Sequence, residues 1–331
     1  MKILFLIGNG FDLNLGLKTS YKDFYKFYIE VESPNSVVET FKKELSENID
    51  NWADLEMCLG QYTDRFKDDE DDKFVLLLDD IQDKLAEYLE SVNTDVVISN
   101  EIIESMGKDL FFLDRHLSEK NKKILNSFKA RFNSTNYSAN IISFNYTNSF
   151  EKIFSYKNTS LPINKRSYQG YAYQNTINRV IHIHGTTEDN MILGVNDVSQ
   201  IENVSFKTNK KIIRSLVKPE LNKNTETLRD FDVEELIKQS DIICIYGMSL
   251  GQTDNFWWHA IAEQLKLSKK LLIIYTRASD IVKRRAYKSI DIQEKVKDRI
   301  LSTIEVKDDE KEEILNKIIV SLNSKMFSTD N

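Results

Sequence analysis

An uninterrupted apolar run near the start of the chain, Ile3–Ile7, leads directly into a turn that contains Gly8 and Gly10. A run without polar residues is typical of a strand buried on both faces, as in a parallel sheet that is covered by helices. Glycine suits a sharp turn after such a strand and a close approach of another group to the backbone. The start of the chain therefore predicts the first strand and turn of an α/β domain.

Strand-like and helix-like patterns alternate in the second half of the chain, which predicts a mostly parallel, Rossmann-like α/β sheet flanked by helices. The expected strands are Ala139–Phe144, Val180–His184, Met191–Val195, Ile242–Tyr246 and Leu271–Tyr275. The expected helices are Ser149–Phe154, Glu226–Gln239, Phe256–Leu267 and Ala278–Lys288. Between about residues 20 and 132 the apolar residues follow helical spacing only. We therefore expect a large all-helical insertion after the first strand and its helix.

These patterns divide the chain into three parts. Residues 1–30 and 136–306 are predicted to form a nucleotide-binding α/β domain, and residues 31–135 the helical insertion. Residues 307–331 are predicted to form a C-terminal helix, because their apolar residues have amphipathic spacing.

Composition restricts the class of partner. The net charge is -7, so the chain lacks the basic surface that duplex DNA or an anionic membrane would require. No apolar run approaches the roughly 18 residues of a membrane span. The two cysteines, Cys58 and Cys244, provide neither a disulfide framework nor a cysteine-based zinc site. We expect a cytoplasmic protein with no membrane or nucleic-acid partner.

Glycines gather after the predicted strands, where ligands bind in open α/β sheets. Seven of the 10 glycines have such positions: Gly8, Gly10, Gly16, Gly185, Gly194, Gly247 and Gly251. The loop Gly8–Asp12 suits phosphate through its backbone N–H groups. It lacks both the third glycine of the dinucleotide fingerprint and the lysine spacing of a P-loop, so a plain tight turn is the alternative.

Two further strand ends carry polar side chains. Asn145 follows Ala139–Phe144, and its carboxamide can cap the next helix or can bind a ribose or a water. His182 and His184 lie on one face of a strand by alternation, but other ligands with zinc-like spacing are absent. His184 immediately precedes Gly185 and is the histidine placed to meet a ligand.

The stretch from Ile242 to Gly251 is an apolar strand that runs into a G-x-S-x-G sequence centred on Ser249. This pattern presents the nucleophile of α/β-hydrolases. Those enzymes need a histidine after the serine, and only His259 follows, within the helix that the turn would start. We favour a close-approach turn at Gly247 and Gly251 in which Asp254 or Asn255 caps this helix, and keep a Ser249 hydrolase as a third option.

Five motifs follow one another over most of the chain: IGNGFDLNLGLKTSYKDF, SFNYTNSFE, HIHG, ILG and YGMSLGQTDNFWW. In this order they resemble the bacteriophage abortive infection AbiH family. Its members are associated with bacterial defence in which infection ends in arrest or death of the host cell. The resemblance implies a phage-defence role.

The same order of motifs is more distantly similar to the sirtuin-type NAD-binding fold. There a glycine loop holds the pyrophosphate, an asparagine contacts the ribose, a His-Gly strand end supplies the catalytic histidine, and a Gly-x-Ser turn closes the site. The resemblance implies that the catalytic residues are His184 and Asn145. It implies that the residues binding NAD or a related nucleotide are Gly8, Asn9, Gly10, Phe11, Asp12, Gly185, Gly247, Ser249 and Asp254.

Two departures from sirtuins bear on the reaction. Thr147 stands where the sirtuin motif has an aspartate, and the four cysteines of the zinc ribbon are absent. Defence relatives of the fold without this ribbon cleave NAD to nicotinamide and ADP-ribose, so the resemblance implies NAD as the substrate and no metal. His184 would be the general base, since an unperturbed histidine titrates nearest neutrality. Asn145 would position the water or the ribose hydroxyls.

The main alternative is a binding module. In that case the pocket senses a nucleotide without cleaving it, and the helical insertion recognises a phage-derived or host protein as the trigger. A homo-oligomer is also expected, since defence enzymes of this fold often assemble. Neither the trigger nor the oligomeric state can be derived from the sequence.

Overall fold

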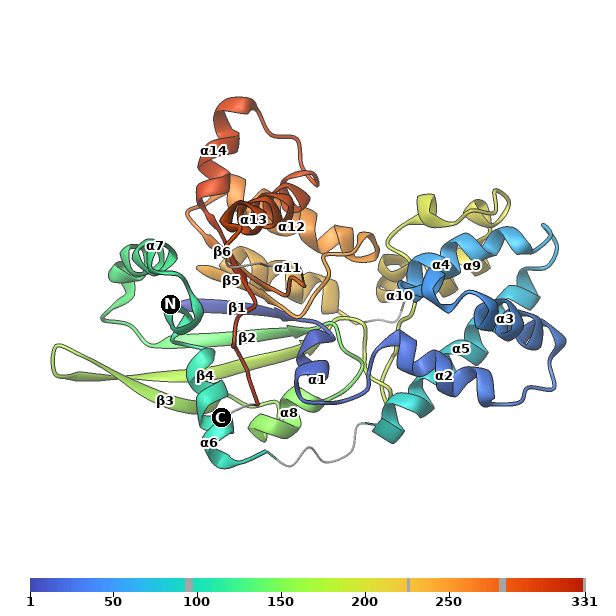
Figure 1. The fold of residues 1–331 in the computed structure, drawn as a ribbon, viewed down its shortest axis with the longest axis horizontal. Helices are drawn as coiled ribbons and strands as arrows, with labels where there is room; N and C mark the ends of the chain where they lie inside the picture. The colour runs from blue at the N-terminus through green and yellow to red at the C-terminus, as the bar shows by residue number, and fades with distance from the viewer. Residues whose placement is uncertain (93–97, 225–226, 280–283, 330–331) are drawn as a thin grey trace.

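Seven strands form one sheet in the order β3-β4-β2-β1-β5-β6-β7 (Figure 1). The computed structural model describes residues 1–92, 98–224, 227–279 and 284–329. The strands are β1 (Lys2–Ile7), β2 (Tyr137–Ser143), β3 (Leu161–Tyr168), β4 (Tyr171–His182), β5 (Ile242–Tyr246), β6 (Leu271–Thr276) and β7 (Ile318–Leu322). β3 is antiparallel to β4, and the other neighbouring pairs are parallel. The predicted mostly parallel, Rossmann-like sheet is confirmed.

Helices cover both faces of this sheet (Figure 1). One face carries α1 (Gly10–Asn14), α6 (Asn100–Asp109), α7 (Glu119–Lys129) and α8 (Ser149–Phe154). The other carries α11 (Arg229–Gln239), α12 (Asn255–Leu267), α13 (Ala286–Leu301) and α14 (Asp308–Asn316). None of the described helices is long and apolar enough to cross a membrane.

The apolar run of β1 is explained by these two layers. Ile3, Phe5 and Ile7 contribute to the core on one face, and Leu4 and Leu6 to the core on the other. At most 1% of each side chain is exposed. A strand at the centre of a sheet with helices on both sides has no solvated face, and the sequence accordingly shows no alternation.

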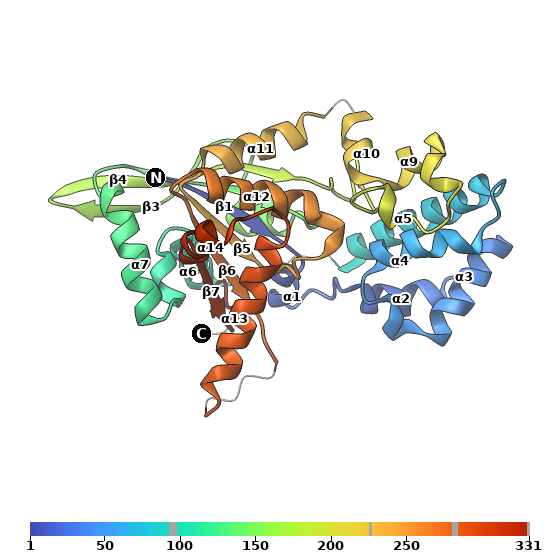
Figure 2. The same cartoon turned by 90° about the horizontal axis from the view of Figure 1, so that it is seen from above.

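The remaining helices form a separate body, the helical lobe, which comprises α2 to α5, α9 and the connection 191–209. Its helices are α2 (Tyr21–Glu30), α3 (Ser36–Glu47), α4 (Leu55–Tyr62), α5 (Asp71–Val92) and α9 (Lys210–Leu216). Figures 1 and 2 both place it at one end of the molecule, with α10 (Lys218–Asn224) leading back to α11. The helices of the segment 31–135 are therefore divided between two cores, because α6 and α7 pack against the sheet.

The predicted strand at Met191–Val195 is wrong. Leu193 and Val195 are fully buried in the core of the helical lobe, and the Val195 N–H donates to the Leu216 carbonyl at 2.8 Å. The sheet offers this segment no partner, because β4 already pairs with β2 and with β3. The apolar run is long enough for a buried strand but is used to fill the lobe instead.

The predicted C-terminal helix is also only partly correct. α14 ends at Asn316, and residues Ile318–Leu322 form β7, which pairs parallel with β6 at the edge of the sheet. Three consecutive β-branched residues, Ile318 to Val320, favour a strand at this point. Helical spacing over this tail hides the change, since a short buried strand and a helix turn show similar apolar density.

Three predicted boundaries shift. β4 ends at His182 rather than His184, α11 begins at Arg229, and α13 begins at Ala286. Glu226 and residues 280–283, which belong to the two predicted helices, lie outside the described residues.

The carboxyl ends of β1 and β5 meet at the point where the strand order reverses, because β2 and β4 extend the sheet to one side of β1 and β5 to β7 extend it to the other. Here the two following loops touch backbone to backbone. A Cβ atom on Gly10 would lie 2.5 Å from the Cα of Gly247, and Gly247 has φ +69°. Glycine is thus required on both sides of this contact.

We predict that Gly10→Ala lowers the free energy of unfolding by about 1–3 kcal/mol, because the added methyl group would overpack the contact between the two loops. Gly251→Ala is the matched control, since Gly251 has φ −60° and the nearest atom to its added Cβ would be 3.6 Å away. Urea unfolding of both variants measures the difference. Equal stability of the two variants would contradict the contact.

Candidate functional site

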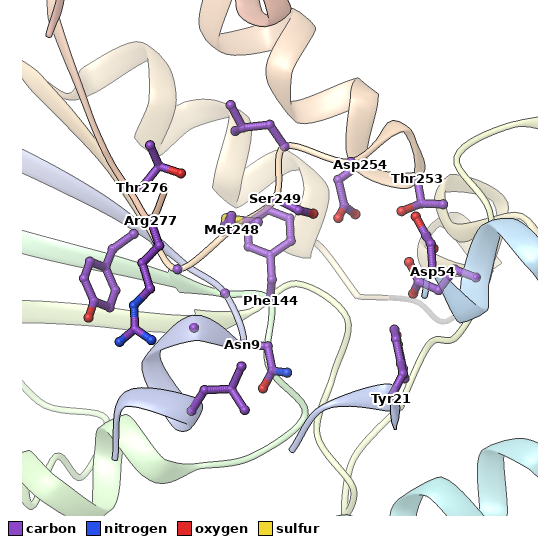
Figure 3. A pocket seen from close by; sticks show the side chains of 18 of the residues that line it. Asn9, Tyr21, Asp54, Phe144, Met248, Ser249, Thr253, Asp254, Thr276 and Arg277 are labelled. Carbon is purple, nitrogen blue, oxygen red and sulfur yellow. The ribbon is translucent and has the colours of Figure 1, made fainter. Parts of the chain in front are cut away.

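A cavity of about 520 Å³ opens at the carboxyl ends of β1, β5 and β6, against the helical lobe (Figure 3). The sheet side of its lining includes Gly8, Asn9, Gly10, Phe144, His184, Tyr246, Gly247, Ser249, Asp254, Trp258, Tyr275, Thr276 and Arg277. The lobe contributes Tyr21 and Glu56, and the turn before α4 contributes Asp54. Both the volume and the position at a switch point are typical of small-ligand sites.

The structure brings His184 and Asp254 together in the wall of this cavity. His184 lies two residues beyond β4 and is 4% exposed, with its ring edge-on to Phe144 at 5.3 Å between centroids. Its Nε2 is 3.3 Å from Oδ1 of Asp254. Asp254 precedes α12, but its side chain makes no capping hydrogen bond to that helix. The carboxylate is turned toward the histidine and toward a lysine.

That lysine is Lys218, the first residue of α10. Its ammonium donates to Asp254 Oδ1 at 2.9 Å and to Glu56 Oε2 at 2.7 Å. The lysine is 4% exposed and Glu56 is 6% exposed. Tyr146 completes the group, with its hydroxyl 3.3 Å from Glu56 Oε1. A buried charged chain therefore runs from the sheet through α10 into α4 of the helical lobe.

The buried charged side chains of this group shift one another's pKa values. Burial alone would raise the pKa of Asp254, but Lys218 and His184 outweigh it and hold that pKa below its ordinary value. Burial would lower the pKa of Lys218, yet Asp254 and Glu56 raise it. Burial raises the pKa of Glu56, and the attraction of Lys218 opposes this only in part. Asp254 and Lys218 are thus held as an ion pair, and Glu56 accepts a proton more readily than an exposed glutamate.

Sequence reasoning missed Glu56, Lys218 and Tyr146. Glu56 lies in the first turn of α4, and an acidic residue there looks like ordinary support of a helix start. Lys218 precedes Pro219 at the start of the short helix α10 and has no motif around it. Only the meeting of segments about 160 residues apart shows that the two are partners.

The glycine loop is engaged within the protein. The Gly8 N–H donates to the Tyr246 carbonyl at 3.0 Å, and the Gly10 N–H donates to the Gly247 carbonyl at 2.8 Å. Both glycines line the cavity, as predicted, but these two N–H groups already have partners. Their absent side chains serve the contact between the loops.

Asn145 faces a side chamber of about 100 Å³, which shares Asn9, Tyr21, Phe144 and Tyr146 with the main cavity. The carboxylate of Asp12 also lines this chamber and accepts hydrogen bonds from Thr147 and Ser149. Burial raises the pKa of Asp12, and the hydrogen bonds from Ser149, Thr147 and Asn145 oppose that rise. Asn145 Oδ1 is buried without a hydrogen-bond partner among the described residues. Asn145 and His184 therefore line two different spaces, which have four lining residues in common.

Two predicted nucleotide-binding residues line neither space. Phe11 is 1% exposed and packs against Phe150 and Phe327, at centroid distances of 5.8 and 5.6 Å. Gly185 has φ +71°, and a Cβ there would lie 1.9 Å from the Asn190 carbonyl oxygen, so it serves a tight turn. His182, the other histidine of the motif, lies with Nε2 at 2.7 Å from Glu151 Oε1 and Nδ1 at 2.9 Å from the Asn145 carbonyl oxygen, which fixes that loop.

Ser249 is exposed at the cavity and lacks the partners of a hydrolase nucleophile. In the described part of the chain no histidine is hydrogen-bonded to it, and His259 instead contacts the Thr303 carbonyl at 2.7 Å. Among the non-glycine residues of this turn it is Leu250, and not Ser249, that has a positive φ. The geometry does not favour a Ser249 hydrolase.

Charged groups are distributed unevenly around the cavity. Figure 3 shows Asp54 and Asp254 toward one side and Arg277 toward the other. Within the described residues, no three or more His, Cys, Asp or Glu side chains are arranged to hold a metal ion. The arrangement thus combines a buried histidine, an acidic wall and a separate guanidinium.

Comparison with known proteins identifies one family. The sequence model described as "Bacteriophage abortive infection AbiH" matches residues 4–276, which include the glycine loop, both histidines, Lys218 and Asp254. No curated protein matches the chain. The similarity to sirtuins, drawn from short motifs, stays a prediction.

We predict that Lys218→Met lowers the free energy of unfolding by about 3–5 kcal/mol, because it leaves buried carboxylates without a counter-charge. Lys223→Met is the control on the same helix, since Lys223 pairs with Glu220 at the surface, where such pairs contribute at most about 1 kcal/mol. Adding Glu56→Gln to Lys218→Met should restore part of the loss. Equal effects of the two lysine substitutions in denaturant unfolding would contradict a buried ionic chain.

The partly buried carboxyl group of Asp230 on α11 should make the stability of the folded protein depend on pH. Burial raises its pKa from 3.8 to about 6, and Asn222 donates a hydrogen bond to it at 2.6 Å. The folded state therefore favours the protonated form, and this contribution to stability is lost as the pH rises through about 6. Asp230→Asn should gain stability relative to the wild type between pH 5 and pH 8. Thermal unfolding at both values tests this, and a difference independent of pH would refute it.

Proposed function

The chain belongs to the bacteriophage abortive infection AbiH family, and within that role in phage defence we propose that it hydrolyses NAD to nicotinamide and ADP-ribose in the cavity described above. The observation that carries the proposal is the buried pair of His184 and Asp254 at the wall of this cavity. Three features of the cavity support the proposal: its location in the fold, the charge of its lining and the position of a base.

The position of the cavity in the fold favours a nucleotide as its ligand. The cavity lies outside the carboxyl ends of β1 and β5, where the strand order reverses, and open α/β sheets bind nucleotides at such points. An aromatic ring forms part of its wall: Phe144 lines the cavity and is backed by the buried ring of Trp258, with 19° between the ring planes. Flat apolar walls of this kind suit a base or a nicotinamide ring.

The charge of the cavity lining favours a ligand with a positively charged ring. The carboxylates of Asp54, Glu56 and Asp254 line this side of the cavity, and one buried ammonium, that of Lys218, pairs with Glu56 and Asp254, so negative charge is in excess here. The nicotinamide ring of NAD is positively charged while bonded to the ribose. As that bond breaks, positive charge develops on the ribose carbon, and nearby carboxylates stabilise it.

His184 supplies a base for the attacking water. Because Nε2 of His184 faces Asp254, Nδ1 is the ring nitrogen that accepts the proton in this mechanism. Water oxygen then bonds to the ribose carbon, nicotinamide leaves with the electron pair of the broken C–N bond, and the water proton passes to His184. Lys218 holds Asp254 ionised, so that Asp254 orients the ring and stabilises the imidazolium that forms. Asn145 Oδ1, unpaired in the adjoining chamber, is an acceptor for a ribose hydroxyl.

The test is nicotinamide release from NAD by the purified protein, with binding of NAD measured in parallel. His184→Ala should lower the rate at least about a hundredfold, as expected for loss of a general base. Ser249→Ala should lower the rate far less than His184→Ala, because Ser249 lines the cavity but accepts no proton in this mechanism. Unchanged folding is checked by circular dichroism.

Other outcomes separate the alternatives. Binding of NAD without release by the wild type would replace hydrolysis by nucleotide sensing, in which the helical lobe meets a protein partner. Neither binding nor release would contradict the proposal and would leave the family and the fold. Loss of release in Ser249→Ala but not in His184→Ala would favour the serine hydrolase.

A further inference from the structure

Two N–H groups of the glycine loop are not available to a phosphate. The N–H groups of Gly8 and Gly10 are used by the carbonyls of Tyr246 and Gly247. The helix after this loop, α1, is only 5 residues long and carries Asp12 in its first turn. An anionic ligand would therefore meet little positive charge at this loop.

Arg277 lies elsewhere on the same cavity, directly after β6. It is the only lysine or arginine among the described residues that line the cavity. Its Nη2 donates to the amide oxygen of Asn14 at 3.1 Å, which steadies the guanidinium without neutralising it. Within the described chain no carboxylate forms an ion pair with it, so its charge remains available.

The surroundings of Arg277 are polar and open. Thr276 and Ser324 line the cavity beside it, and Ser324 Oγ accepts the Met326 N–H at 3.0 Å, which leaves its O–H to donate. Figure 3 shows Arg277 on the opposite side of the cavity from Asp54 and Asp254. The cavity thus has a cationic end and an acidic end.

We infer that Arg277 binds the phosphate groups of the ligand, while the acidic end receives a positively charged ring. This rests on the proposed function, and it narrows the substrate class to a dinucleotide with a cationic ring, the oxidised form NAD+ in preference to NADH. A guanidinium fits phosphate oxygens with two parallel hydrogen bonds, which an ammonium cannot do. Opposite charges at the two ends of one cavity also set the direction in which the ligand lies.

Two fragments of the substrate test the two ends separately. ADP-ribose carries the phosphates without the cationic ring, and nicotinamide riboside carries the ring without phosphate. In titration calorimetry Arg277→Ala should weaken the binding of ADP-ribose at least about tenfold, as expected for the loss of charge-assisted hydrogen bonds. The binding of nicotinamide riboside should not change. Arg277→Lys should fall between Arg277→Ala and the wild type.

Controls separate a local from a general effect of charge. Arg285→Ala removes an exposed arginine that does not line the cavity and should bind both fragments like the wild type. Asp54→Asn keeps an acceptor for the Met57 N–H, which Asp54 caps in the wild type. This variant should bind nicotinamide riboside more weakly and should bind ADP-ribose like the wild type.

The outcomes distinguish this inference from the proposed function. If Arg277→Ala binds ADP-ribose as tightly as the wild type while the wild type releases nicotinamide from NAD, the phosphate role of Arg277 is wrong and the hydrolase stands. If ADP-ribose binds through Arg277 but NAD is not cleaved, the phosphate role stands and hydrolysis fails. No ADP-ribose binding by the wild type overturns the phosphate role.

Discussion

The buried ammonium of Lys218 is the interaction on which the rest of the site depends. It lies between Glu56 of the helical lobe and Asp254 of the α/β domain, and all three side chains are removed from most of the solvent. A buried carboxylate without its partner is strongly unfavourable, so the lobe, α10 and the start of α12 are held in one arrangement. That arrangement closes one wall of the cavity, and through Asp254 it also fixes the ring of His184.

The two features that a nucleotide site needs, close backbone approach and charged groups, are carried here by different segments of the chain. The glycines at the ends of β1 and β5 allow the two loops to touch, and the N–H groups of Gly8 and Gly10 are used in that contact. Charge comes from side chains at the rim: carboxylates next to the helical lobe and a guanidinium after β6. A ligand in this cavity is therefore positioned by side chains over a floor that the glycines build.

Prediction from the sequence succeeded where local pattern alone decides the structure. The strands β1, β2, β5 and β6 are apolar runs buried by helices on both faces, and the cavity follows from the polar and glycine residues after them. Prediction failed where the elements packed beside a segment decide its structure. Residues 191–195 look like a strand but find no free sheet edge, and residues 318–322 look helical but find β6. Glu56 and Lys218 could not be predicted, because each resembles a surface residue until the fold brings them together.

Membership of the abortive infection AbiH family gives the biological setting, and the geometry gives the chemistry to examine within it. The cavity joins an acidic wall, a histidine held by an aspartate and a separate arginine, all at the switch point of a Rossmann-like sheet. The most direct measurement is a crystal structure of the wild-type protein with ADP-ribose. We predict the phosphates against Arg277 and the terminal ribose between His184 and the chamber of Asn145. Ordered ADP-ribose bound anywhere outside this cavity would contradict a nucleotide site at the carboxyl ends of β1 and β5.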